Sequence, residues 1–208
     1  TNSIDDAALL LEVMAGDDDY DSTVSTIPVE KYTEVSKIKK QRVAVIKESY
    51  EMEGNDPEIK LAIDQVISGL KKQGHEVDLV SFPYLDYMVP VYYVLTTAEA
   101  SSNLARFDGV HYGYRSKKAK GIEEVYKKSR SEGFGPEVKR RIMAGTFVLS
   151  HGYYDAYFTK AQKVRRLLKD QTEDIMANCD VVIMPTTIST AFKIGDGKDP
   201  VAMYLQDQ

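Results

Sequence analysis

The sequence has a single cysteine, no long apolar run and no excess of basic residues, and each absence excludes a class of protein. One cysteine, Cys179, cannot form an internal disulfide, which fits a reducing compartment. A net charge of -5 argues against a dominant nucleic-acid surface. No apolar run approaches the ~20 residues of a membrane span. No charged-then-apolar leader opens the chain, so the cytoplasm is the expected location.

Histidines and glycine-rich loops are also scarce. His75, His111 and His151 show no metal-ligand spacing and have no cysteine pair to assist them, so we expect no zinc site. The loop at 47–57 lacks the repeated glycines that approach a nucleotide phosphate, so no nucleotide site is expected there. Cys179 precedes an apolar run and is predicted to be a small core residue.

The two ends of the sequence read as cuts through a larger protein. The chain starts with TNSIDDAALLLEVMAG, in which Ser3 is a suitable N-cap and the apolar positions predict a helix with one stripe on a core. It ends with DPVAMYLQDQ, without a closing element. We therefore expect residues 1–208 to form a single α/β segment of a larger domain that is truncated at both ends.

The pattern of apolar residues predicts the element types. A β-branched run at 42–47, an amphipathic helix at 56–73 and an alternating strand at 75–82 make a strand–helix–strand unit with parallel pairing. Residues 90–177 read mostly as helices, and 180–186 read as a further strand. The predicted class is α/β, with a partial mixed sheet flanked by helices.

Two polar features invite a functional reading. Adjacent serines at Ser101 and Ser102 suggest a nucleophile, but no glycine-flanked elbow surrounds them, so we predict that they cap or pack a helix. The 14 tyrosines, many in VYYVL, VHYGYR and GYYDAYF, suit the wall of a polar pocket, an interface or the core.

Adjacent arginines begin the helix behind Gly135–Pro136. At ~100° per residue, Arg141 shares the direction of small and apolar residues, whereas Arg140 falls with Glu137 on a flank. The inward face is formed by Val138, Gly145, Val148 and Gly152. An inward guanidinium needs a carboxylate or carbonyl partner, so Arg141 forms either an internal salt bridge or a fork onto a ligand carboxylate.

Several longer segments resemble the amidase signature family. They are EASSNLARFDGVHYGYR, SRSEGFGPEVKRRIMAGTFVLSHGYYDAYFTKAQKVR, DVVIMPT and DPVAMYLQD. Within that family they resemble the A subunits of glutamyl-tRNA(Gln) amidotransferases, along essentially the whole chain. The resemblance implies an enzyme of protein biosynthesis that hydrolyses glutamine and supplies ammonia for converting Glu-tRNA(Gln) to Gln-tRNA(Gln).

The resemblance also implies partners. These are subunits B and C of a heterotrimer, and Glu-tRNA(Gln) would be contacted through the partner subunit, which would also use ATP and magnesium. The family's catalytic serines and lysine would lie upstream of Thr1, so this segment is expected to hold no catalytic residue and no cofactor, and to be inactive alone.

Three residues match the family's glutamine pocket. Arg141 matches the residue that binds the substrate α-carboxylate, Asp207 the acid that meets the α-amino group, and Tyr92 a tyrosine that lines the site. Two other readings stay open: an amidase-signature hydrolase of other amides, and a non-catalytic ligand-binding or interaction module.

Overall fold

The computed structural model of the chain describes residues 1–34, 39–191 and 193–194. The chain divides into two compact units, Thr1–Gln41 and Arg42–Gln208. The expected single segment over residues 1–208 stays a prediction.

In the first unit, helix α1 (Ile4–Met14) begins where the sequence predicted. The Asp6 amide donates to the Ser3 hydroxyl at 3.1 Å, which is the expected N-cap. The Thr33 amide donates to Glu12 of the helix at 2.6 Å, so the returning chain is fastened to α1. No residue of α1 is buried. The prediction that its apolar stripe lies on a core is therefore wrong for the described residues, because stripe positions such as Ile4 and Met14 are exposed, at 85% and 80%.

The second unit is built on a three-stranded sheet in the order β2-β1-β3. Strand β1 (Arg42–Ile46) leads through the short helix α2 (Lys47–Tyr50) and α3 (Pro57–Lys72) into β2 (Glu76–Val80), and β3 (Val181–Ile183) lies on the other side of β1. Both pairings are parallel. The strand–helix–strand prediction and the α/β class are confirmed. A mixed sheet was expected, but the three strands among the described residues are all parallel.

The main core lies where the sheet meets the long helix α7 (Lys160–Asn178). Central strand β1 is buried from Val43 to Ile46 because it has a neighbour on each side. Ile175 and Cys179 pack against Ala44 and Ile46. Cys179 is thus a core residue, as predicted.

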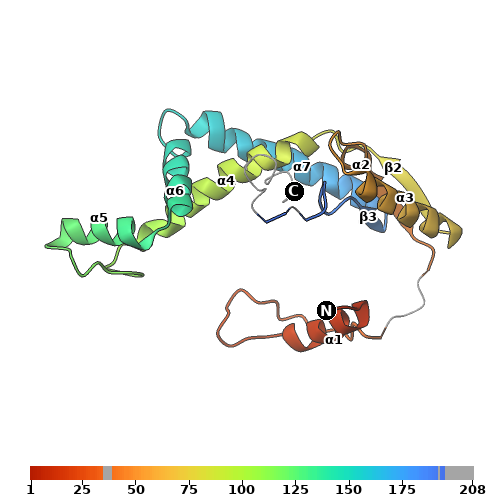
Figure 1. The fold of residues 1–208 in the computed structure, drawn as a ribbon, viewed down its shortest axis with the longest axis horizontal. Coiled ribbons are helices and arrows are strands. Elements are labelled where there is room, and N and C mark those ends of the chain that lie inside the picture. Colours follow the sequence, from red (N-terminus) through yellow and green to blue (C-terminus); the bar gives the residue numbers. More distant parts are fainter. Residues whose placement is uncertain (35–38, 192, 195–208) are drawn as a thin grey trace. The chain divides into compact units, whose positions relative to one another are not determined.

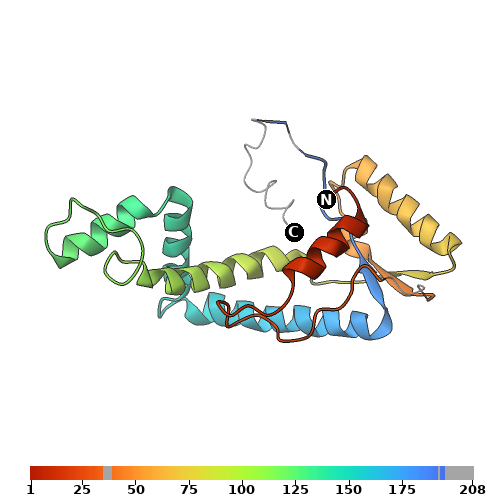
Figure 2. The ribbon, with the colours of Figure 1, turned by 90° about the horizontal axis from the view of Figure 1, so that it is seen from below.

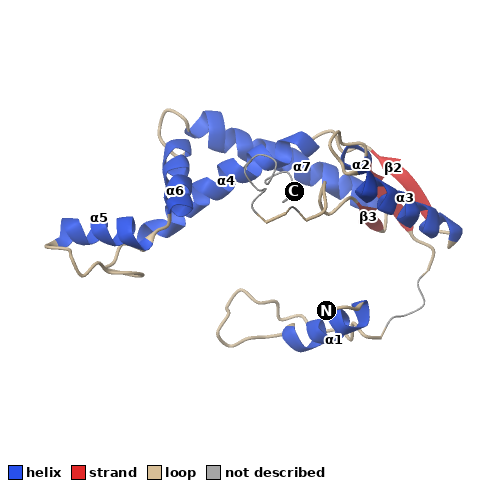
Figure 3. Ribbon diagram, in the orientation of Figure 1, coloured by secondary structure: helices blue, strands red, loops and turns tan. Residues whose placement is uncertain are grey.

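Beyond the sheet, the unit continues as a set of helices (Figure 1). They are the 3-10 turn η1 (Leu85–Tyr87), α4 (Met88–Asn103), the 3-10 turn η2 (Leu104–Arg106), α5 (Ile122–Gly133), α6 (Pro136–Val148) and the π-helical turn η3 (Asp155–Thr159). Helices α4 and α7 run side by side, and α6 crosses α4 (Figures 1 and 2). Strands are confined to one end of this unit (Figure 3). Among the described residues, no helix has the length and apolarity needed to cross a membrane.

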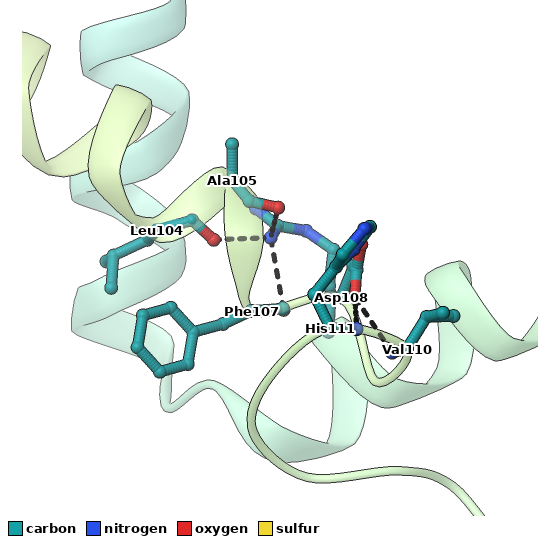
Figure 4. Close-up of polar contacts among 7 residues, drawn as sticks. Leu104, Ala105, Phe107, Asp108, Val110 and His111 are labelled. Atoms are coloured by element: carbon teal, nitrogen blue, oxygen red, sulfur yellow. Dashed lines mark hydrogen bonds and ion pairs between the residues drawn. The ribbon is translucent and has the colours of Figure 1, made fainter.

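The loop that follows η2 is held by one arginine of α5. The Arg130 guanidinium donates to the carbonyl of Leu104 at 2.7 Å and to that of Phe107 at 3.3 Å (Figure 4). Asp108 closes the next turn by accepting from the His111 amide at 2.9 Å. Arg130 therefore binds the end of α4 to α5 through backbone acceptors, which are insensitive to the side chains of the loop.

Helix α6 ends earlier than its apolar pattern predicts. It stops at Val148, and the Ser150 hydroxyl donates to the Phe147 carbonyl at 2.7 Å. Gly152 then lies in a turn and not on the helix face, so its place in the inward stripe is a wrong prediction. The π-helical turn that follows was not predicted either.

Candidate functional site

The described candidate residues lie on two crossing helices. Tyr92 belongs to α4 and Arg141 to α6. Asp207, the third predicted residue, lies outside the described residues. The described part of the candidate site is therefore the crossing of α4 and α6.

Gly145 allows this crossing to be close. A Cβ added at Gly145 would lie 1.9 Å from the Thr97 carbonyl oxygen and 2.6 Å from Ser101 Cβ. No side chain fits at that separation, so the absence of a Cβ brings the two backbones together. Arg141 lies one helical turn before Gly145, and its position relative to α4 is set by this contact.

A hydroxyl pair adds a second link at the crossing. The hydroxyls of Ser101 and Thr146 are 3.0 Å apart. Ser101 thus packs helix against helix, in agreement with the structural reading of that serine.

The two arginines differ in exposure as the helical geometry predicts. The Arg141 side chain is 34% exposed and that of Arg140 is 72% exposed. On the predicted inward face, Gly145 and Val148 are buried and Val138 is half-buried. Arg141 therefore does face inward, although only partly.

Glu137 is bound by both arginines. Its Oε1 accepts from Arg141 Nε at 3.0 Å, and its Oε2 pairs with Arg140. Hydrogen bonding to Glu137, followed by hydrogen bonding to Tyr92, raises the pKa of Arg141. The same bond from Arg141 is the main cause that lowers the pKa of Glu137. A salt bridge is therefore present, although it is partly exposed and not internal as predicted, and Tyr92 meets Arg141 from across the crossing.

The guanidinium retains unused binding capacity. Arginine has five donors in a plane, and the only carboxylate oxygen that Arg141 meets in the described part of the chain is Glu137 Oε1 on Nε. With Nε on Glu137 and Tyr92 hydrogen-bonded to the same guanidinium, its remaining donors can still bind a second anion beside Tyr92. The arrangement can bind a carboxylate through a charge-assisted fork.

Within the described ranges, no group of three or more His, Cys, Asp or Glu residues could hold a metal ion. His111 is engaged elsewhere, because its Nδ1 lies 2.8 Å from Asp108 Oδ2. These bonds from the His111 amide and ring hold the pKa of Asp108 well below its usual range.

Sequence reasoning missed the second contact of Glu137 and the close approach at Gly145. Helical geometry places Glu137 on the flank with Arg140, although its i,i+4 spacing to Arg141 also predicts a pair. Gly145 was recognised only as a small residue on the inward face. Nothing in the local pattern indicates that a backbone carbonyl of α4 lies against it.

Comparison with known proteins gives one consistent relationship. The Amidase family model matches residues 1–208. The A subunit of glutamyl-tRNA(Gln) amidotransferase from Fusobacterium nucleatum is 52% identical over 207 residues, covering 99% of this chain and 42% of that protein. The protein of the same name from Koribacter versatilis is also 52% identical and is covered over 43% of its length.

Solved structures agree with this relationship. The crystal structure of the A subunit of glutamyl-tRNA(Gln) amidotransferase from Thermotoga maritima matches the whole chain with a TM-score of 0.68 and 36% identity, over 40% of its own length. 6-Aminohexanoate cyclic dimer hydrolase matches with a TM-score of 0.63 at 16% identity, which shows the fold alone. The chain thus spans about two fifths of the relatives that it matches.

Proposed function

Because the chain belongs to the Amidase family, we propose that it is the glutamine-recognising part of the A subunit of an amidotransferase. The complete protein would hydrolyse glutamine and supply ammonia for converting Glu-tRNA(Gln) to Gln-tRNA(Gln) in the cytoplasm. It would act with subunits B and C, with ATP and magnesium bound on the partner subunit. The observation that carries the proposal is the inward guanidinium of Arg141 beside Tyr92, in a chain 52% identical to such subunits.

Glutamine presents two groups that distinguish it from a simple amide: an α-carboxylate and an α-ammonium group. Arg141 would bind the carboxylate through its two terminal nitrogens, the geometry in which arginine outperforms lysine. Tyr92 would border the same group with its hydroxyl, and Asp207 would accept from the α-ammonium. A site that requires both charges rejects amides that lack them, because its own charges are then left unpaired.

A second candidate is suggested by the bond between Arg141 and Glu137. If Arg141 serves only in that ion pair, the protein would be an amide hydrolase without carboxylate recognition. Its fold would be the one that 6-aminohexanoate cyclic dimer hydrolase shares. The two candidates differ in what Arg141 does for substrates that carry an α-carboxylate.

The test is Arg141→Ala in the complete protein, assayed with glutamine and with a simple amide that has no α-carboxylate. We expect KM for glutamine to rise about 10- to 100-fold, the range for a lost bond to a charged group, with little change for the simple amide. Arg166→Ala is the matched control, because Arg166 forms a comparable i,i+4 pair with Asp170 on an exposed face of α7. Equal losses for both substrates would favour the second candidate.

A further inference from the structure

We propose that Glu137 is a positioning residue for Arg141, and that it orients the guanidinium so that its terminal nitrogens face the ligand carboxylate. The inference rests on the proposed function, since it requires Arg141 to bind a carboxylate. It assigns to the glutamate a role beyond that of a helix-stabilising ion pair.

The geometry of the bond supports this role. Glu137 lies in the first turn of α6, immediately after Pro136, and a negative side chain is favourable there. Its Oε1 accepts from Nε of Arg141 at 3.0 Å. Because both residues belong to one helix, the pair moves as a unit with the crossing at Gly145, and no flexible loop intervenes.

Contact through Nε is what makes the bond orienting. The guanidinium is planar, so a carboxylate on Nε restrains its orientation and leaves donors on the two terminal nitrogens, beside Tyr92, for a second acceptor. Arginine otherwise has many rotamers, and ordering its side chain before the ligand arrives lowers the entropy lost on binding. Glu137 would therefore increase affinity for a carboxylate without touching it.

A glutamate near a carboxylate site also has an opposing effect, because it repels the incoming negative charge. Arg140 reduces that repulsion. It pairs with the other carboxylate oxygen of Glu137, so two guanidinium groups share one carboxylate and a net positive charge remains. With this net positive charge, we expect the gain from orienting Arg141 to exceed the loss from repulsion between Glu137 and the ligand carboxylate.

The experiment compares Glu137→Ala and Glu137→Gln in the complete protein, again with glutamine and a simple amide. Glu137→Ala should raise KM for glutamine about tenfold, leave kcat within about twofold and leave the simple amide unchanged, because only carboxylate binding is disturbed. Glu137→Gln keeps an oxygen acceptor for Nε and should recover most of the loss. Glu173→Ala, which removes an exposed i,i+4 pair with Lys169 on α7, is the control and should change neither substrate.

Each other result contradicts the inference. A lower KM for glutamine in Glu137→Ala would make Glu137 a competitor of the ligand. A parallel loss on both substrates, with a lowered melting temperature, would make it a structural residue. If Arg141→Ala reduces activity equally with glutamine and with the simple amide, the proposed function fails as well. If Arg141→Ala mainly impairs glutamine but Glu137→Ala does not, only the inference about Glu137 fails.

Discussion

The closest contact at the α4–α6 crossing gives the sharpest test of the site's architecture. In Gly145→Ala, the new methyl group would lie 1.9 Å from the Thr97 carbonyl oxygen, where ordinary contact begins at 3.4 Å. The helices would have to separate by about 1.5 Å, the difference between these two distances, because a backbone carbonyl cannot rotate away as a side-chain tip can.

Separation on this scale affects both stability and binding. Overpacking of a buried position lowers the free energy of unfolding by roughly 1–3 kcal/mol, occasionally more. We expect Gly145→Ala to lower it by about 3 kcal/mol or more, at the upper end of that range. The same shift moves Arg141 away from Tyr92, and misplacement by about 1 Å can reduce activity by about 100-fold. Thermal unfolding and glutamine kinetics of the complete protein measure the two effects.

Gly69→Ala is the matched control. Gly69 lies inside α3, and a Cβ built there meets nothing within 4 Å. The same substitution should therefore stabilise the protein by roughly 0.5–1 kcal/mol, because alanine favours a helix. If Gly145→Ala is as stable as the parent protein, α4 and α6 do not cross this closely. The position inferred for Arg141 relative to Tyr92 would then be wrong as well.

Three further predictions concern other parts of the chain. Asp180 has a lowered pKa because it pairs with Arg42. Its contribution to stability is therefore complete above the unfolded pKa of about 4 and is lost as pH falls through the lower folded value. Asp180→Asn should flatten this fall in melting temperature at acid pH, and an unchanged profile of melting temperature against pH would contradict the pairing. Arg130→Lys keeps the charge but moves the donor, because the bonds to Leu104 and Phe107 both come from one terminal nitrogen of the longer, planar guanidinium. Amide hydrogen exchange in residues 104–111 should therefore speed up by more than tenfold, while unchanged exchange would show that the loop is held by other contacts. The purified 208-residue chain should release no ammonia from glutamine, and measurable hydrolysis would place a nucleophile within it.

Much of the fold follows from local patterns. The β-branched run at Arg42–Ile46, the stripe of α3 and the alternation of β2 each predict their element, because each period matches one backbone geometry. Helix ends were harder to predict. At the stop at Val148, the amide and the hydroxyl of Ser150 both donate to the Phe147 carbonyl, and a single hydroxyl leaves no mark on hydrophobic periodicity.

The sequence by itself determined that Arg141 and not Arg140 faces inward, since residues on one helix keep fixed relative directions. Resemblance to a known family then supplied a role for it. The pair of Arg141 with Glu137 lies within one helix and follows from i,i+4 spacing. Only the tertiary structure decided that Arg141 also meets Tyr92 from α4, at a separation that Gly145 permits. Local periodicity specifies where a side chain points along its own helix, but contact between distant segments depends on how closely two backbones can pack.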